Sequence, residues 1–182
     1  MKILFLGYKD CKLHKFLESK YPTLQTENKL VFDYAEHFDY IISFGYKHII
    51  NKQIIDLFQT NIINLHISYL PFNKGYHPNF WSFKDNTPKG VTIHLIDEGI
   101  DTGDILIQKE ITFSKKENTL SKTYNRLIEE IQDLFIENCD DILNGNLKPK
   151  KQKGKGTFHY EKDLQKHNDI LTEKWDTKID KL

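Results

Sequence analysis

Cysteine, net charge and long apolar runs are all scarce in this chain of 182 residues. The only two cysteines, Cys11 and Cys139, are far apart and fit no metal-ligand or Cys-x-x-Cys spacing, so we expect free thiols in a reducing compartment. The 26 basic and 26 acidic side chains cancel, which removes any general attraction to nucleic acid or to an anionic membrane. No apolar run approaches the ~20 residues that span a bilayer, and we expect no secretory signal. The expectation is a cytoplasmic protein with neither a membrane nor a nucleic-acid partner.

Glycine-rich phosphate loops are also missing. A dinucleotide fingerprint needs three glycines in register after the first strand, but Gly7 stands alone there, and no GxxxxGK[ST] loop occurs. The loop 97–104 holds four acidic residues and could suggest a calcium site. The EF-hand pattern fails, however, because Gln108, Thr112 or Lys115 stands where the twelfth-position glutamate should be. We therefore expect no metal ion.

Apolar side chains are sufficient for the core of one domain with a small appendage. Hydrophobic residues make up 38% of the chain, and 12 Phe and 9 Tyr supply many of them. Short apolar runs alternate with helical patterns, which predicts βαβ units with a parallel, right-handed crossover. The expected strands are 2–6, 30–32, 40–44, 61–63, 90–96, 105–113 with a polar interruption at 108–110, and 156–160. The expected helices are one after a capping Asp10 that buries Leu13, Phe16 and Leu17, and those over 51–58, 78–84, 119–143 and 163–171.

The clearest candidate site begins at Asn64, directly after the apolar run 61–63. In α/β folds, the ends of strands are where sites are placed. Asn64 and His66 are two residues apart, so on an extended strand both side chains project from one face. This places a hydrogen-bond donor beside a titratable imidazole. From this stretch alone, a strand end with one structurally satisfied histidine remains the alternative.

A second strand, 90–96, leads into the acidic loop 97–104. An aspartate from this loop that faces the strand end carrying His66 would form a His–Asp pair, which suits proton transfer better than metal binding. On the same strand, His94 has either a structural role or a place beside that pair.

The segment 72–81 is rich in aromatic and amide side chains, which is typical of a segment that lines a ligand-binding site. Gly75 permits a turn with positive φ, and Pro78 suits the first turn of a helix. We expect Phe80 in the core, and Trp81 either in the core or at the ligand.

Basic residues gather in 148–155, which holds five lysines around Pro149 and Gly154. We interpret this segment as a solvated linker or hairpin, with contact to phosphate as the alternative. The last ten residues are charged, and we expect them to be loosely held.

Three motifs together resemble a known family. They are NxHxSxLPxxxG from Asn64, GVTIH from Gly90 and DxGxILxQ from Asp101, and they resemble the formyltransferases that use N10-formyltetrahydrofolate, such as the glycinamide ribonucleotide and methionyl-tRNA enzymes. The resemblance covers residues 40–113 and, more weakly, the first strand. It implies an open, Rossmann-like, mostly parallel α/β sheet with helices on both faces and a short C-terminal hairpin or helix extension. The corresponding division is a catalytic domain over 1–145 and an extension over 146–182 that is not an independent domain.

Two further stretches, GYHPNFW from Gly75 and GTFH from Gly156, resemble the nucleotide-sugar N-formyltransferases. Those enzymes formylate an amino group of a dideoxy-amino sugar for surface polysaccharide such as the O-antigen of lipopolysaccharide. The resemblance implies a nucleotide-linked acceptor, which we expect to be dTDP-4-amino-4,6-dideoxyglucose, and a homodimer. The chain departs from the family in a short segment before Tyr40, where we expect a strand or helix to be missing. We also expect no large C-terminal domain like that of the tRNA enzymes, and no early glycine-rich loop like that of the purine enzyme occurs.

The resemblance also assigns roles to individual residues. Asn64 would donate to the developing oxyanion, His66 would take the proton of the amine, and Asp101 would hold His66 and help to move protons. The residues expected to bind the cosubstrate N10-formyltetrahydrofolate are Phe44, Gly45, Tyr46, Lys47, Asp97, Glu98, Gly99 and Ile100. The residues expected to bind the amino sugar nucleotide are Tyr76, His77, Asn79 and Trp81.

Three alternatives remain open from the sequence. The acceptor could be another amine, such as glycinamide ribonucleotide. The chain could be a folate-binding module without catalysis, although the Asn64, His66 and Asp101 set speaks against that. It could also be a metal-dependent hydrolase using His66, His94 and Asp101.

Overall fold

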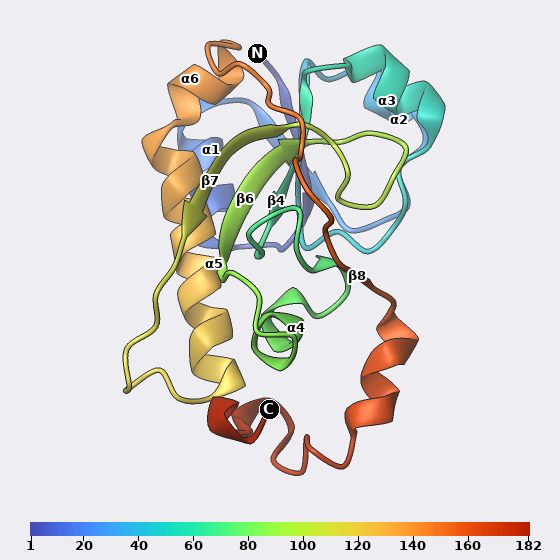
Figure 1. Cartoon of the computed structure of the whole chain (residues 1–182). Coiled ribbons are helices and arrows are strands. Elements are labelled where there is room, and N and C mark those ends of the chain that lie inside the picture. The colour runs from blue at the N-terminus through green and yellow to red at the C-terminus, as the bar shows by residue number, and fades with distance from the viewer.

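The computed structural model describes all residues from 1 to 182 and places a six-stranded sheet at the centre of the molecule (Figure 1). The strand order is β2-β1-β3-β4-β6-β7. The first three pairings are parallel, and β6 runs antiparallel to both of its neighbours, β4 and β7. The strands of this sheet are β1 (Ile3–Gly7), β2 (Thr23–Thr26), β3 (Tyr40–Phe44), β4 (Ile62–His66), β6 (Gly90–Leu95) and β7 (Ile105–Glu110). The expected open, mostly parallel sheet is confirmed.

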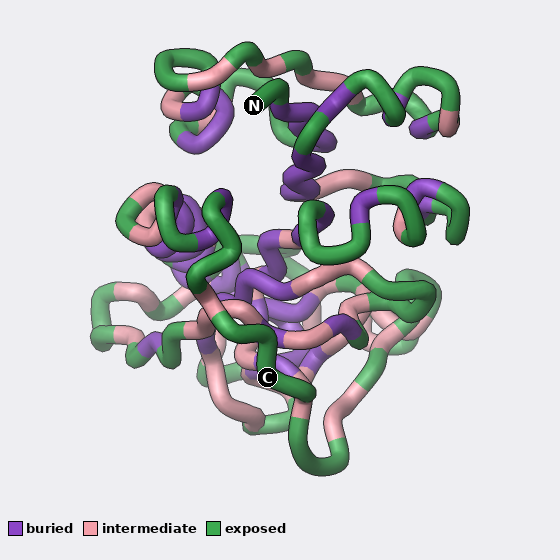
Figure 2. The backbone as a smooth tube through the Cα atoms, turned by 90° about the horizontal axis from the view of Figure 1, so that it is seen from above, coloured by how far each residue is buried: buried purple, intermediate pink, exposed green.

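Helices cover both faces of this sheet, as expected. One core lies between the sheet and α1 and α5, and it includes Leu13, Leu17, Leu127 and Ile131. The opposite face packs against α2 and α3 through a second core. In Figure 2 the buried backbone gathers inside the molecule and the exposed loops lie around it. The helices are α1 (Lys12–Lys20), α2 (Phe32–Ala35), α3 (Lys52–Phe58), α4 (Pro78–Lys84), α5 (Leu120–Glu137) and α6 (Cys139–Leu143).

Side-chain caps fix the starts of several helices. The side chain of Asn51 accepts from the N–H of Ile54 at the start of α3. The start of α1 differs from the expectation. Cys11 is its N-cap and accepts from the N–H of His14 through sulfur, whereas Asp10 lies outside the helix with a φ of 58°.

Several secondary-structure elements differ from those expected from the sequence. The expected strand 30–32 is not formed, because residues 30–31 lead into α2, which begins at Phe32, and the edge strand is β2 at Thr23–Thr26 instead. The polar stretch 108–110 is the end of β7 rather than an interruption, because an edge strand can carry polar and charged side chains, and the expected strand residues 111–113 lie outside β7. The long helix expected over 119–143 is divided at Asn138 into α5 and α6.

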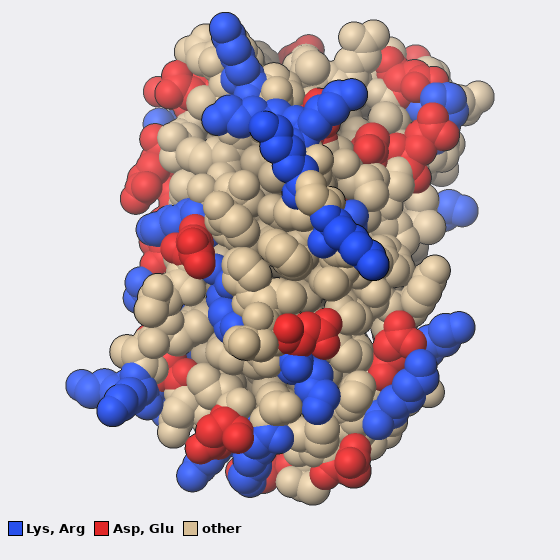
Figure 3. All heavy atoms as spheres, in the orientation of Figure 1, with Lys and Arg blue, Asp and Glu red and all other residues tan.

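The C-terminal extension forms no hairpin. Its strand β8 (Phe158–His159) pairs in parallel with β5 (Lys74–Gly75), and Lys150 forms an isolated antiparallel bridge to Ile105. The expected helix over 163–171 is a 3₁₀ helix, η1 (Glu161–His167), followed by two shorter ones, η2 (Lys174–Asp176) and η3 (Ile179–Lys181). In Figure 3 the lysines of 148–155 form a basic streak across the viewed face.

The last ten residues are docked rather than loose. Thr177 is fully buried, its carbonyl accepts from the N–H of Leu120, and the N–H of Ile179 donates to Asn118. Leu171, Ile179 and Leu182 pack around the cluster of Phe80, Trp81 and Leu120. The tail therefore covers α4 and the start of α5 at the lower end of the molecule in Figure 1. No helix of the chain has both the length and the apolar character to cross a bilayer.

Candidate active site

A cleft opens at the strand ends where the connections of two neighbouring strands leave toward opposite faces of the sheet. The connection after β1 leads to α1 on one face, and the connection after β3 leads to α3 on the other, so the strand ends at Gly7 and Phe44 diverge. The cleft has a volume of about 750 Å³. This size is within the range that holds a cofactor-sized ligand.

At the floor of the cleft lie Asn64, His66 and Asp101. The Nδ2 atom of Asn64 donates to Oδ1 of Asp101 at 3.1 Å. The Nδ1 atom of His66 lies 3.7 Å from Oδ2 of the same carboxylate. Asn64 and His66 come from β4, and Asp101 comes from the loop after β6, so the two motifs read from the sequence meet in space. Their chemical roles stay predictions.

The hydrogen bonds of His66 define which ring nitrogen carries a proton. Its Nε2 atom lies 3.0 Å from the carbonyl oxygen of Asn73, which can only accept, so Nε2 is the donor. The other nitrogen, Nδ1, faces the carboxylate of Asp101. A proton that His66 takes up must therefore reside on Nδ1, between the ring and Asp101.

The sequence-based site set did not include His94, which completes this cluster. His94 lies opposite Asn64 in the β4–β6 register and is almost fully buried. Its Nδ1 donates to the carbonyl of Leu95 at 2.8 Å, and its Nε2 lies 3.3 Å from Nδ2 of Asn64 and 3.4 Å from Oδ1 of Asp101. The cross-strand register would have revealed it, but that register depends on the antiparallel direction of β6, which the sequence did not predict.

The carboxylate of Asp101 is held in its charged form. Burial alone would raise the pKa of Asp101, but the nearby His66 and His94 and the N–H of Gly75 outweigh burial and keep this pKa well below its usual value. The Gly75 N–H donates to Oδ2 at 2.9 Å. Asp101 has a φ of 54°, a left-handed conformation that non-glycine residues adopt only where the surroundings favour it. The site is therefore built around one fixed negative charge.

All eight residues expected to bind the folate line this cleft. They are Phe44, Gly45, Tyr46, Lys47, Asp97, Glu98, Gly99 and Ile100. Gly45 has a φ of +72°, and a Cβ there would lie 2.3 Å from the ring of Tyr8, another lining residue. On the rim, Lys52 of α3 contacts Glu98 at 2.5 Å and joins the helix to the acidic loop.

The four residues expected to bind the acceptor do not all line the same cavity. Tyr76 and His77 line the cleft, and His77 and Asn79 line a second cavity beside it. Trp81 lines neither, because its ring is buried and stacks on His159 at a centroid distance of 4.0 Å. Phe80 is buried, in agreement with its expected core position. Trp81 therefore supports the wall from behind, and its contact with a sugar stays an untested prediction.

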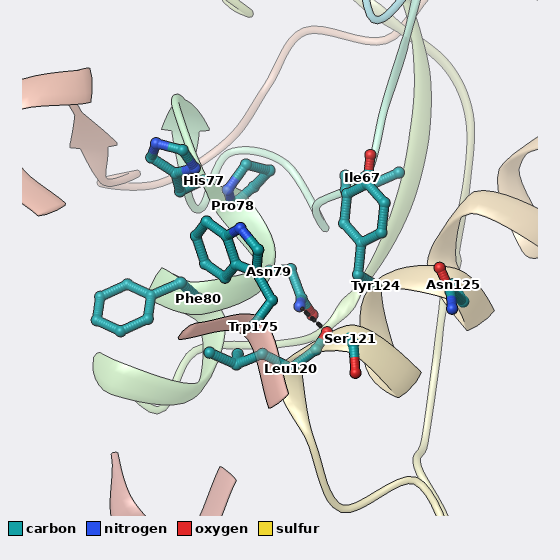
Figure 4. Close-up of a pocket in the computed structure, with 10 residues that line it drawn as sticks. All are labelled: Ile67, His77, Pro78, Asn79, Phe80, Leu120, Ser121, Tyr124, Asn125 and Trp175. Atoms are coloured by element: carbon teal, nitrogen blue, oxygen red, sulfur yellow. Dashed lines mark hydrogen bonds between the residues drawn. The ribbon is translucent and has the colours of Figure 1, made fainter. Parts of the chain in front are cut away.

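The second cavity has a volume of about 450 Å³ and shares Ile67, His77, Pro78 and Tyr124 with the cleft (Figure 4). In Figure 4, Trp175 of the tail lies on one side and Tyr124 of α5 on the other, with Asn79 between them. No part of the sequence analysis predicted Trp175 here, because the tail was read only by its charge. The side chains of the chain form no group of three or more His, Cys, Asp or Glu that could hold a metal ion.

Comparison with known proteins gives the family. A family model described as formyl transferase matches residues 12–139, which is more than half of the chain. Among curated proteins, the methionyl-tRNA formyltransferase of Clostridium acetobutylicum is 33% identical over 63% of this chain and 37% of its own length. The dTDP-4-amino-4,6-dideoxyglucose formyltransferase of Mycobacterium tuberculosis H37Rv is 30% identical over 74% of this chain and 56% of its own. The chain thus spans about a third to a half of the length of these curated relatives.

A solved structure matches over the whole chain. The formyltransferase PseJ from Anoxybacillus kamchatkensis, in complex with UDP-4,6-dideoxy-4-formamido-L-AltNAc and tetrahydrofolate, is 44% identical and has a TM-score of 0.95. The match covers 100% of this chain and 97% of that one. Together with the family match and the meeting of both motifs in one cleft, this shows that the chain belongs to the formyl transferase family.

Proposed function

We propose that this protein transfers a formyl group from N10-formyltetrahydrofolate to the amino group of a nucleotide-linked amino sugar. The observation that carries the proposal is the cluster of Asn64, His66 and Asp101 on the floor of a cleft large enough for a folate. The complex of PseJ with tetrahydrofolate and a formamido sugar nucleotide supports it. Each of the two substrates then has a cavity, and the two cavities adjoin.

The chemistry is acyl transfer to an amine. A neutral amine attacks the formyl carbon, a tetrahedral intermediate with a negative oxygen forms, and its collapse expels the folate nitrogen. Asn64 contacts both Asp101 and His94 through Nδ2, so both of its hydrogens are engaged before substrate binds. Donation to the oxyanion requires Asn64 to release one of them, and the 3.3 Å contact with His94 is the longer of the two.

Proton movement falls to His66 and Asp101. The amine loses a proton as it bonds to carbon, and the leaving nitrogen gains one. The Nδ1 atom of His66 faces Asp101, so a proton taken up there is stabilised by the fixed carboxylate until the leaving group needs it. The Nε2–H bond to the carbonyl of Asn73 keeps the ring in place during this cycle.

The acceptor that we propose carries a UDP group. The dTDP-linked sugar expected from the sequence agrees with the name of a relative at 30% identity. PseJ, at 44% identity over the whole chain, is in complex with a UDP-linked 4-formamido-4,6-dideoxy sugar. A UDP-linked 4-amino-4,6-dideoxy sugar is therefore the acceptor to test first, with dTDP-4-amino-4,6-dideoxyglucose as the second.

The deciding experiment is a direct assay. The protein is incubated with N10-formyltetrahydrofolate and a panel of UDP- and dTDP-linked amino sugars, with glycinamide ribonucleotide alongside, and products are identified by mass spectrometry. The expected result is a gain of one formyl group on a UDP-linked amino sugar. Folate binding without transfer to any amine would support a folate-binding module instead. Hydrolysis without folate that a chelator abolishes would support the metal-dependent hydrolase.

Three broader expectations belong to the same proposal. The proposed setting is synthesis of a surface polysaccharide in the cytoplasm, and the proposed assembly is a homodimer. The exposed rings of Phe158 and Tyr160 on and beside β8 support a contact surface in the C-terminal extension, because 37% and 58% of these residues is accessible. Light scattering of the wild type and of Tyr160→Ala tests it, since a monomer in the wild type would exclude the dimer.

The boundary between a catalytic domain at 1–145 and the extension at 146–182 also remains a proposal.

A further inference from the structure

We propose that the cavity between Trp175 and Tyr124 is the slot for the uracil-type base of the acceptor nucleotide. This rests on the proposed function, because it assigns one part of the acceptor to the second cavity. The slot is formed by a tail segment and by α5, which are far apart in the sequence. Because the slot adjoins the catalytic cleft through His77 and Pro78, a ligand can occupy both at once.

An exposed indole lines the slot. Trp175 is 44% accessible, although the segment around it is firmly docked. One face of its ring lies against His77, with centroids 5.5 Å apart and the planes tilted by 33°. Figure 4 shows Tyr124 across the cavity from it. Aromatic faces of this kind stack on nucleobases, because every base presents a flat π surface.

A buried polar atom in the slot has no partner. Asn79 is 5% accessible, and its Nδ2 donates to the carbonyl of Leu120 at 2.9 Å, but its Oδ1 atom makes no hydrogen bond. A buried acceptor without a donor costs free energy, so such atoms usually have a function. Uracil and thymine present an N3–H donor on their pairing edge, and this donor would satisfy Oδ1 of Asn79.

The position of Trp175 depends on the docked tail. Ser121 donates to Asp176 at 2.6 Å, and the N–H of Leu120 donates to Thr177 at 3.1 Å. These bonds fix the residues on the C-terminal side of Trp175 to the first turn of α5. The tail thus carries a specificity-determining residue for the acceptor. The folate cleft, in contrast, receives only Glu161 from the C-terminal extension.

Calorimetric titration of the full-length protein with UDP, without folate or sugar, tests the proposal. We expect Trp175→Ala to weaken UDP binding by about tenfold or more, and Trp175→Phe to stay within about threefold, because stacking is kept. Tyr34→Ala, which removes a ring of similar accessibility on α2, should leave it unchanged. Tetrahydrofolate binding should be unchanged in all three. Equal UDP binding by wild type and Trp175→Ala would overturn the proposal.

Ligand variants and fluorescence separate the base contacts from folding effects. Methylation of N3 removes the donor to Asn79, so N3-methyl-UDP should bind at least about tenfold more weakly than UDP. The chain has two tryptophans, and Trp81 is buried, so UDP should quench the emission of Trp175 in the wild type and leave Trp175→Phe unquenched. Equal affinity for N3-methyl-UDP, or equal quenching in Trp175→Phe, would argue against the slot.

The outcomes separate this inference from the proposed function. If UDP binds through Trp175 but no amino sugar nucleotide is formylated, the proposed function fails and the base slot stands. If formyl transfer to a UDP-linked sugar occurs and Trp175→Ala changes neither its KM nor UDP affinity, the base slot fails alone.

Discussion

The amide of Asn64 donates to the carboxylate of Asp101 at 3.1 Å and so connects the end of β4 to the loop that follows β6. The same carboxylate accepts the N–H of Gly75, which lies in the wall of the same cleft. One charged residue therefore positions parts of three separate segments. Changes at this carboxylate should affect both turnover and the stability of the folded protein.

Asp101→Asn should lower turnover by at least about 100-fold, because an amide cannot stabilise a proton on His66 as a carboxylate does. The amide keeps nearly the same shape, so the protein should fold. Steady-state kinetics with saturating folate and sugar nucleotide measure the effect, and circular dichroism confirms the fold. Turnover like that of the wild type in a folded variant would remove Asp101 from the mechanism.

Asp101 should also make stability depend on pH in the acid range. Its pKa in the folded protein is lowered from 3.8, so above pH 4 the charged form contributes its full stabilisation. As the pH falls below 3.8, the unfolded chain takes up the proton first and this stabilisation is lost. Urea unfolding of wild type and Asp101→Asn should give a stability difference that is constant from pH 7 to about 5 and shrinks below about pH 4. A difference that stays the same at pH 3 would contradict the assignment.

Asn64→Ala should lower turnover by about 10²–10³-fold, because the oxyanion loses its donor. His66→Asn should lower it by at least about 10²-fold, because no side chain remains to take the proton. Folate affinity, measured by equilibrium titration, should change little, since the cleft walls are intact. Either variant that is folded and retains full activity would exclude its assigned role.

His94→Asn tests a positioning role. The amide can still donate to the carbonyl of Leu95, but it is too short to reach Asn64 and Asp101 as Nε2 does. We expect kcat to fall about 10- to 100-fold with little change in the KM for folate, because misplaced catalytic groups slow chemistry more than binding. A rise in KM with unchanged kcat would place His94 in ligand binding instead.

Gly45→Ala should weaken folate binding. Its Cβ would lie 2.3 Å from Tyr8, so this ring must move in the cleft. Gly145→Ala is the matched control, because Gly145 has a similar φ of +69° but open space where its Cβ would be. Both variants should lose about 1–2 kcal/mol of stability from the left-handed backbone, and only Gly45→Ala should lose folate affinity. Equal folate affinity in the two would show that Tyr8 does not contact the ligand.

Much of the fold could be predicted because its strands are apolar and short. The strands β1 (Ile3–Gly7) and β3 (Tyr40–Phe44) are buried throughout, and the motif that starts at Asn64 begins within β4 (Ile62–His66). The β2 strand was missed because Thr23–Thr26 is a polar edge strand that is only partly buried. Local hydrophobicity cannot identify such a strand, since its position depends on backbone pairing with β1.

The residues proposed for catalysis could be predicted from the sequence, whereas part of the proposed acceptor site could not. Asn64, His66, His94 and Asp101 all stand in sequence motifs, but the contact of His94 with Asn64 follows from the cross-strand register. Trp175 lies in a charged tail whose few apolar residues, Ile179 and Leu182, are enough to dock it on Phe80 and Leu120. Two apolar residues are too few to give a periodic pattern. The position of the tail is therefore set by tertiary packing and could not be predicted from the sequence pattern.

The parallel pairing of β5 with β8 joins residues 74–75 to residues 158–159 and has a consequence for synthesis on the ribosome. Nearly all residues that line the cleft lie between Tyr8 and Ile128 and leave the ribosome early. Of the residues that line the neighbouring cavity, only Trp175 follows much later. The cleft wall at Gly75 gains its partner strand only after residues 158–159 have been synthesised, so we expect a nascent chain to complete both cavities late.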